Sequence, residues 1–325
     1  MKDKQPDVYL VNNEGDRIEG VHRFSHEAMA TIFDALIQHP DYQYSRQAAI
    51  AAFNEIDRIE QDLSHFVENS DISRLNDAPA DTPVQLGIEA FQCLAIAQRI
   101  CSETGGAFDV TVGALFACLL DEKKQPRKVS PEQLKAAIAL TGCNLLELDD
   151  DRLTVRKAVA GVRIDLGGIG KGFAVDKVGE MLGEWKIERA MIHGGYSTVL
   201  ATKAPQGARG WPITFSNPLD LKQTIVRMWL ANEAVSGSGL AEGMHIIDPR
   251  KAKPITGKIA SWSCAADAAG ADGLSTAFMV MDAGEIEAYC RQHKSVRGLV
   301  AETGGDGKTV KFKRYGDWGK VELLV

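Results

Sequence analysis

The chain has 325 residues, 45% of them apolar, which is enough for a buried core in one large or two ordinary domains. Its formal net charge of −7 and the absence of any lysine- or arginine-rich run argue against a general nucleic-acid binder. No stretch is long and apolar enough for a transmembrane segment, and the polar N-terminus lacks a leader's apolar region. A cytoplasmic protein is expected, although an exported protein with its leader trimmed would read the same.

The cysteines are scattered, with no C-x-x-C pair and no histidine at zinc spacing. Most of them are therefore expected to be core thiols in a reducing compartment. The six are Cys93, Cys101, Cys118, Cys143, Cys264 and Cys290.

Residues 1–24 are polar, with a short strand-like run at Val8–Val11, and are expected to extend a main domain of residues 25–325. Apolar residues at helical spacing predict helices over Ser45–His65 and Leu86–Thr104. A third helix is expected to begin at Ser130, where a proline and a glutamine follow as in a capping box.

The second half of the chain is richer in strand patterns. Predicted strands cover residues 145–148, 153–155, 162–166, 190–195, 211–215, 224–230 and 234–235, with two more between 310 and 325. A strand–turn–helix unit runs from Ile259 to Phe278. Helices and strands mix without strict alternation, so the predicted fold class is α+β.

The stretch Val162–Asp176 combines a strand, a glycine-rich turn, a lysine and a helix start. A turn at Gly167–Gly172 would aim backbone N–H groups and a helix N-terminus at an anion, and Lys171 would add a positive charge. The glycines could equally form only a tight turn beside a solvated lysine. Neither a Walker A loop nor a dinucleotide fingerprint fits, because Gly172 follows the lysine and the glycines alternate.

Asp272 and Thr276 stand four residues apart, where a polar turn leads into the apolar helix Leu274–Met281. A carboxylate and a hydroxyl on one helical face suit Mg²⁺, which keeps few protein ligands. The alternative is that Asp272 caps the helix and Thr276 packs in the core.

Two further residues carry possible chemistry. His245 follows a methionine and precedes Ile-Ile-Asp-Pro, and beside a metal-bound pyrophosphate it could take a proton from an attacking hydroxyl. Otherwise it is an ordinary surface or core histidine. Asp109 follows Gly-Gly-Ala-Phe and has the alternative role of capping backbone donors in a turn.

Together these stretches resemble the ApbE family of FAD:protein FMN transferases. Blocks similar to those of the family occur in order over roughly residues 26–285, and Asp165–Asp176 is the most specific, resembling D-L-G-G-I-A-K-G-Y-A-V-D. The others are Met29–Thr31, Ser64–Asn76, Gly105–Thr111, His245–Pro249 and Ala271–Thr276.

The resemblance implies a single compact, T-fold-like α+β domain and an Mg²⁺-dependent enzyme. Its implied reaction transfers FMN from FAD to a Ser or Thr hydroxyl of a client flavoprotein and releases AMP. The implied metal ligands are Gly170 (through its carbonyl), Asp272, Ser275 and Thr276, and the implied catalytic residues are His245 and Lys171. The implied FAD-binding residues are Met29, Phe66, Asn76, Asp109, Lys171 and Asp176.

Several positions depart from the family pattern and leave substrate detail open. Tyr196 stands where Asp is usual, His193 where Asn is common, and Ala30 in place of the glycine of the first block. The loop before His245 is short. Two alternatives to transfer therefore remain: hydrolysis of FAD to FMN and AMP, and non-catalytic binding of FAD.

Overall fold

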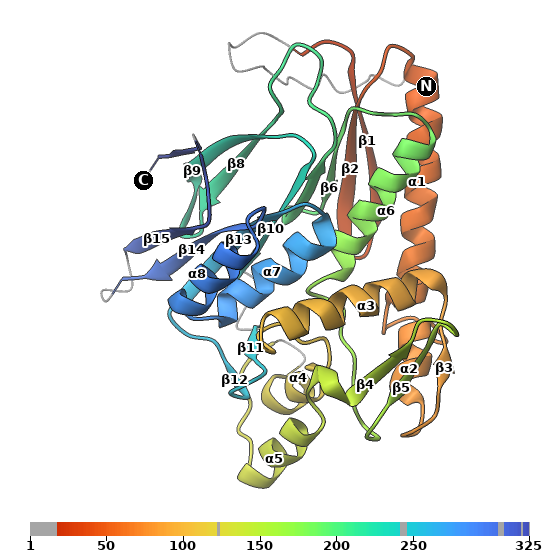
Figure 1. Cartoon of the computed structure of the whole chain (residues 1–325), viewed down its shortest axis with the longest axis vertical. Coiled ribbons are helices and arrows are strands. Elements are labelled where there is room, and N and C mark those ends of the chain that lie inside the picture. Colours follow the sequence, from red (N-terminus) through yellow and green to blue (C-terminus); the bar gives the residue numbers. More distant parts are fainter. Residues whose placement is uncertain (1–17, 122–123, 241–245, 305–308, 320, 325) are drawn as a thin grey trace.

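The computed structural model describes residues 18–121, 124–240, 246–304, 309–319 and 321–324 of the chain. Figure 1 shows a large sheet, helices against one of its faces, and a smaller helical and stranded region below. The mixture of helices and strands confirms the predicted α+β class. The strand-like run Val8–Val11 and the catalytic candidate His245 lie outside the described residues.

An eight-stranded antiparallel sheet is the scaffold of the molecule. In spatial order its strands are β1 (Val21–Ala28), β2 (Thr31–Gln38), β6 (Ala190–Gly194), β7 (Thr198–Ala201), β10 (Glu233–Gly239), β13 (Lys258–Ala265), β14 (Arg297–Thr303) and β15 (Val310–Tyr315). The strand predictions at residues 190–195 and 234–235 fall on β6 and β10. β7 and β10 are the two strands at the centre of this order.

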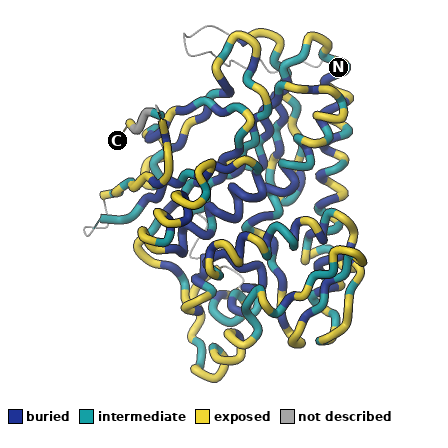
Figure 2. Tube along the Cα trace, in the orientation of Figure 1, coloured by how far each residue is buried: buried dark blue, intermediate teal, exposed yellow. Residues whose placement is uncertain are grey.

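Helices cover one face of the sheet. The dark blue parts of the tube in Figure 2 are the buried residues, and they lie where these helices pack on the sheet. The helices are α1 (Tyr42–Leu63), α3 (Ile88–Glu103), α6 (Gly170–Glu184), α7 (Ala268–Val280) and α8 (Ala283–Gln292). α1 and α3 confirm the two long predicted helices to within three residues at each end. α7 is buried along nearly its whole length, which fits its apolar composition and its place against β10 and β13.

A second, smaller sheet covers the other face. It consists of β8 (Trp211–Asn217), β9 (Asp220–Leu230) and β16 (Glu322–Leu323). Its apolar side chains, including Trp211, Ile213 and Met228, form a core with Leu36 and Met191 of the large sheet. Both sides of the large sheet are thus buried, as a sheet with two apolar faces requires.

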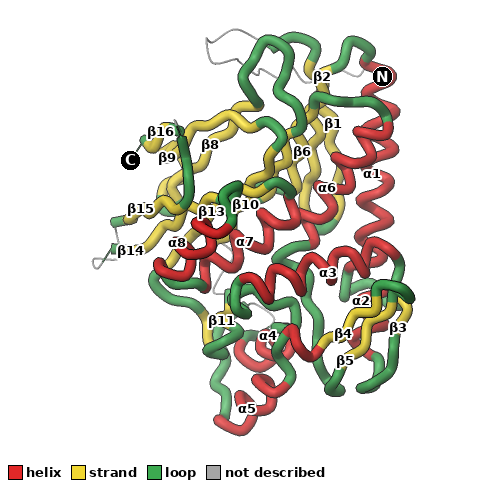
Figure 3. Tube along the Cα trace, in the orientation of Figure 1, coloured by secondary structure: helices red, strands yellow, loops and turns green. Residues whose placement is uncertain are grey.

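The remaining elements form the lower region, where helices and short strands are interspersed with loops (Figure 3). They are α2 (Asp71–Asp77), β3 (Val84–Gln85), α4 (Gly113–Leu119), α5 (Pro131–Ala139), the 3₁₀ helix η1 (Cys143–Leu145), β4 (Leu146–Asp149), β5 (Thr154–Lys157), β11 (Ile247–Asp248) and β12 (Lys253–Pro254). The predicted start at Ser130 is confirmed, because Ser130 and Gln133 form a complete capping box.

The strand predicted at residues 162–166 is wrong. Val162, Ile164 and Leu166 are buried on alternate positions as expected, but the segment has only an isolated bridge between Arg163 and Val112. A side chain takes the place of a partner strand: Asn76 donates from Nδ2 to the Ile164 carbonyl at 3.1 Å and accepts from the Ile164 N–H at 2.6 Å. The alternation of apolar residues correctly predicted a buried face, but it cannot show whether another strand pairs with this segment.

Two helix starts also differ from expectation. α6 begins at Gly170, so Gly170–Gly172 form its first turn and are not part of the preceding turn. α7 begins at Ala268 with Asp267 as N-cap, so Asp272 lies inside the helix. The alternative reading of Asp272 as an N-cap is therefore excluded. The run of small residues from Ala268 to Ala271 carries no apolar periodicity that would mark the true start.

Candidate active site

α7 presents its polar side chains to strand β10. The Ser236 hydroxyl donates to Asp272 Oδ1 at 2.9 Å, and one turn later the hydroxyls of Ser238 and Thr276 lie 3.2 Å apart. Ser275 Oγ lies 2.7 Å from Ser238 Oγ and donates to the Asp272 carbonyl at 2.8 Å. The predicted trio of Asp272, Ser275 and Thr276 is thus brought together, with Asp272 and Thr276 on one helical face as their spacing predicts.

Asp272 is only 4% exposed, and its carboxylate has neutral partners among the described residues. Besides Ser236, the Thr198 hydroxyl lies 3.4 Å from Oδ1, and the Gly172 N–H donates to Oδ2 at 3.0 Å. Neither a lysine nor an arginine of the described chain forms an ion pair with it. Burial of a carboxylate without a counter-charge is costly, and a bound cation is the usual compensation.

The glycine-rich segment, residues 167–172, approaches α7 at two points, one before α6 and one in its first turn. A Cβ at Gly168 would lie 3.2 Å from Thr276 Oγ1, and one at Gly172 would lie 2.3 Å from the Ala268 carbonyl oxygen. Only glycine allows the second approach, because that contact is with backbone that cannot move aside. Gly170, the predicted carbonyl ligand, stands between these two contact points. The glycine-rich segment and the polar side of α7 therefore form one site, although the bonded residues Gly172 and Asp272 are 100 residues apart.

Lys171 lies in the first turn of α6, half-buried, between Gly170 and the glycine that donates to Asp272. The N-cap residue of α6, Ile169, makes no side-chain cap. The N–H groups of Gly170 and Gly172 are bonded to the Leu166 carbonyl and to Asp272, so α6 offers an anion the positive end of its dipole and the Lys171 side chain.

Asp176, one of the predicted FAD-binding residues, is used within the protein. Its two carboxylate oxygens accept the N–H groups of Ala268 and Ala269 at 2.7 and 2.8 Å, at the start of α7. Burial raises its pKa from 3.8 to about 7, against the two backbone hydrogen bonds, which lower it. Asp176 therefore ties α6 to the helix that carries Asp272.

Asn76, also predicted to bind FAD, uses its side-chain amide on the backbone of Ile164. The Asn76 carbonyl in turn accepts from the buried Lys157 ammonium at 2.6 Å. These contacts hold the segment that leads into the glycine-rich turn. A direct contact of Asn76 with flavin stays a prediction.

Asp109 lies in a buried turn that borders the same site. Its Oδ1 accepts from the Thr111 N–H at 2.8 Å and the Thr111 hydroxyl at 2.6 Å, so it does cap a backbone donor. Burial raises its pKa, and these hydrogen bonds oppose the rise. The neighbouring Phe108 reaches the glycine-rich turn, where a Cβ at Gly168 would be 3.2 Å from its ring.

Met29 is half-buried against the core, whereas Phe66 is exposed on the surface of the molecule. Met29 and Ala30 both have positive φ angles, 50° and 55°, in the tight turn between β1 and β2. Such a turn needs left-handed residues at both positions, which explains why glycine suits the second one in the family pattern. Phe66 follows α1 with 88% of its surface exposed, and its contact with FAD stays a prediction.

Three hydroxyl residues of this site were not predicted from the sequence: Thr198 on β7, and Ser236 and Ser238 on β10. The latter two are two residues apart, so they point to the same face of their strand. That spacing was a usable signal, since paired serines on an otherwise apolar strand need buried polar partners. Thr198 carried no such signal, and only the pairing of β7 with β10 places it near Asp272.

Comparison with known proteins gives the class of this fold and site. A model of the ApbE family matches residues 29–300. The FAD:protein FMN transferase of Haemophilus influenzae is 31% identical over 236 residues, covering 67% of this chain and 68% of that protein. The one from Vibrio cholerae is 28% identical over 281 residues, covering 81% and 82%.

Solved structures agree with this assignment. The ApbE protein of Thermotoga maritima superposes with a TM-score of 0.79 at 26% identity, covering 91% of this chain and 97% of that one. The flavin transferase ApbE of Vibrio cholerae gives 0.76 at 25% identity, covering 92% and 97%. The chain belongs to the ApbE family. The expectation of an enzyme is confirmed with it, and flavin transfer is the activity that its relatives share.

Proposed function

We propose that this protein is an Mg²⁺-dependent flavin transferase that moves FMN from FAD to a Ser or Thr hydroxyl of a client flavoprotein. The observation that carries the proposal is Asp272, a buried carboxylate with neutral partners that accepts from hydroxyls on one side and from the Gly172 N–H in the first turn of α6 on the other. The names of the relatives supply FAD as donor and a protein as acceptor.

The residues present fit a magnesium ion. Asp272 and Thr276, with Ser275 beside them and the Gly170 carbonyl from the turn, offer the hard oxygen ligands that Mg²⁺ prefers. Such a site also leaves positions for water and for phosphate oxygens. When bound, the ion would neutralise phosphate charge and polarise the phosphorus for attack.

The remaining roles belong to the chain's own groups. Lys171, at the positive end of the α6 dipole, binds the phosphates and stabilises the negative charge that develops on the leaving AMP. His245, outside the described residues, is retained as the base that takes the proton of the client hydroxyl. The client oxygen then forms a bond to the FMN phosphorus, and the bond from that phosphorus to the AMP oxygen breaks.

The test is an incubation of the protein with FAD, Mg²⁺ and a flavoprotein of the same organism that has an exposed acceptor Ser or Thr. The proposal predicts a covalent FMN mass on the client and one AMP released per adduct. The client with that residue changed to Ala is the matched control and should stay unmodified. AMP without adduct would indicate hydrolysis, and bound but intact FAD would indicate a storage protein; both results would contradict transfer.

A further inference from the structure

A disulfide joins Cys101, in the last turn of α3, to Cys143, the first residue of η1, across 42 residues of sequence and 6.5 Å between Cα atoms. The expectation of core thiols is therefore wrong for these two, and buried thiols are found at Cys93, Cys264 and Cys290. The disulfide was not predicted, because nothing in the sequence shows that the end of one helix meets a turn so far along the chain.

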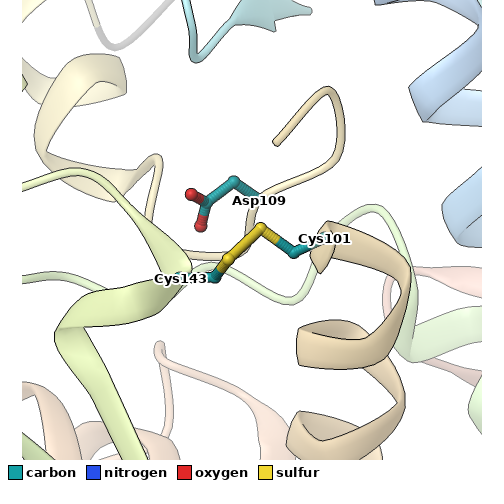
Figure 4. A group of neighbouring side chains, drawn as sticks. All are labelled: Cys101, Asp109 and Cys143. Carbon is teal, nitrogen blue, oxygen red and sulfur yellow. A yellow bond between two sulfur atoms is a disulfide. The ribbon is translucent and has the colours of Figure 1, made fainter. Parts of the chain in front are cut away.

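Figure 4 shows that Asp109 lies directly beside the disulfide. The two sulfur atoms and a carboxylate oxygen of Asp109 lie within 4.8 Å of one another. All three residues belong to segments that meet at the turn Gly105–Thr111, the block that borders the glycine-rich turn of the active site.

Both ends of the disulfide are hydrogen-bonded to this block. On one side, the Gly106 N–H donates to the Cys101 carbonyl at 2.8 Å. On the other, the Gly142 N–H donates to Thr111 Oγ1 at 2.7 Å, and the backbone of Cys143 lies close enough to the Asp109 carboxylate to lower its pKa. Thr111 Oγ1 is the same atom that donates to Asp109. The side chain of Asp109 is thus oriented by residues 142–143, which the disulfide ties to α3.

We propose that the Cys101–Cys143 disulfide positions Asp109 for FAD, so that the affinity for FAD depends on the redox state of this cysteine pair. This inference rests on the proposed function, because it takes Asp109 to contact FAD. Reduction needs an external dithiol: its two thiols give two electrons and two protons, the Cys101–Cys143 bond breaks to two thiols, and the reductant becomes a disulfide.

The size of the effect is limited by a second tether. Gln98, also on α3, donates from Nε2 to the carbonyl oxygens of Leu146 at 2.9 Å and Cys143 at 3.4 Å. Without the disulfide this amide still holds the turn, but η1 is a three-residue helix with little stability of its own. We therefore expect a three- to tenfold loss of FAD affinity on reduction and not a complete loss.

The experiment measures FAD binding by flavin fluorescence for the oxidised chain and for the chain reduced with a dithiol. Alkylation and mass spectrometry identify the cysteines that have opened. A zinc-selective chelator that leaves Mg²⁺ free is present throughout, because two thiols and a carboxylate are a zinc ligand set. In steady-state assays the KM for FAD should rise three- to tenfold on reduction while kcat stays within twofold, a split that general loss of folded protein would not produce.

The reciprocal measurement needs no variant. If FAD binds the oxidised form more tightly, saturating FAD must make the disulfide harder to reduce by the same factor. A tenfold difference in affinity corresponds to a midpoint about 30 mV lower for this two-electron couple.

Two variants complete the design. Cys143→Ser should bind FAD as weakly as the reduced chain and should no longer respond to the dithiol. Cys118→Ser, which removes a free and partly exposed thiol on α4, should keep the full response. Equal FAD affinity in the two redox states, with an unchanged midpoint, would overturn the inference alone. Failure of the oxidised chain to bind FAD at all would overturn the proposed function itself.

Discussion

Asp272 is the residue on which the assignment of the site depends. Its carboxylate is buried, accepts from two hydroxyls and one N–H, and has no cationic side chain bonded to it in the described part of the chain. Neutral donors stabilise the carboxylate but leave its net negative charge in place, and a bound cation would neutralise it. A carboxylate without a bonded lysine or arginine, beside further oxygen atoms, suits a divalent cation such as Mg²⁺.

Asn76 can be tested separately as a structural residue. Its amide satisfies both backbone groups of Ile164, and Ile164 is buried. Asn76→Ala should therefore lower the free energy of unfolding by about 2–4 kcal/mol, since two hydrogen bonds are lost and their partners stay buried. Chemical denaturation measures this. A loss of FAD affinity with unchanged stability would instead show that Asn76 acts on the ligand directly.

The predicted role of His245 as a general base can be tested by substitution. As general base it contributes to the transfer step and not to ground-state binding of FAD, so His245→Ala should reduce transfer by roughly 10²–10⁴-fold. The dissociation constant for FAD should change little. Single-turnover rates and fluorescence titrations give the two quantities. An equal loss of both would assign His245 to binding or to structure.

At the scale of elements, the pair α6 and α7 is the functional unit. Gly172 allows the close crossing, its N–H reaches Asp272, and Asp176 caps the start of α7. At the other end, the ammonium of Lys258 donates to the carbonyls of Phe278 and Met281. α7 is thus held at both ends by side chains, which fixes its polar face toward β10.

The pKa of Asp176 predicts a dependence of stability on pH. Because the folded-state value is raised from 3.8 to about 7, the folded chain holds this proton more tightly than the unfolded chain between those values. The contribution is fully present below about pH 4 and is lost as the pH rises through 7. Between pH 5 and pH 8 the contribution of Asp176 to the free energy of unfolding should fall by roughly 3 kcal/mol.

Denaturation of the wild type and of Asp176→Asn at pH 5 and pH 8 tests this, since the variant should lack that part of the pH dependence. Asp282→Asn is the matched control, because Asp282 caps the neighbouring helix α8 from an exposed position. Hydrogen bonds from Glu285 and Gly284 lower the pKa of Asp282, so its effect on stability has the opposite sign and appears as the pH falls. Identical pH profiles for the wild type and Asp176→Asn would contradict the assignment.

At the scale of the whole molecule, the large sheet brings distant segments together. β7 and β10 carry the hydroxyls of residues 198, 236 and 238. The glycine-rich segment leads into α6, and Asp272 lies on α7. No described helix is long and apolar enough to cross a membrane. The covering sheet of β8, β9 and β16 closes the face opposite the helices.

Local patterns in the sequence predicted what depends on local physics. The periodicity of α1 and α3, the capping box at Ser130 and the helical spacing of Asp272 and Thr276 were all readable. Non-local pairing was not. The role of Asn76 beside Ile164, the disulfide of Cys101 with Cys143, and the approach of Thr198 to Asp272 each depend on where another segment lies.

The most direct test of the account is the dependence of covalent FMN transfer on Mg²⁺ in the wild type and in Asp272→Asn. The substitution keeps the shape of the side chain and removes its charge, and Asp282→Asn again serves as the control. Intact-mass measurement of the client should show FMN adduct for the wild type and the control only when Mg²⁺ is present, and at least about 100-fold slower adduct formation for Asp272→Asn. Transfer at the wild-type rate by Asp272→Asn, or transfer by the wild type after complete removal of divalent metal, would contradict it.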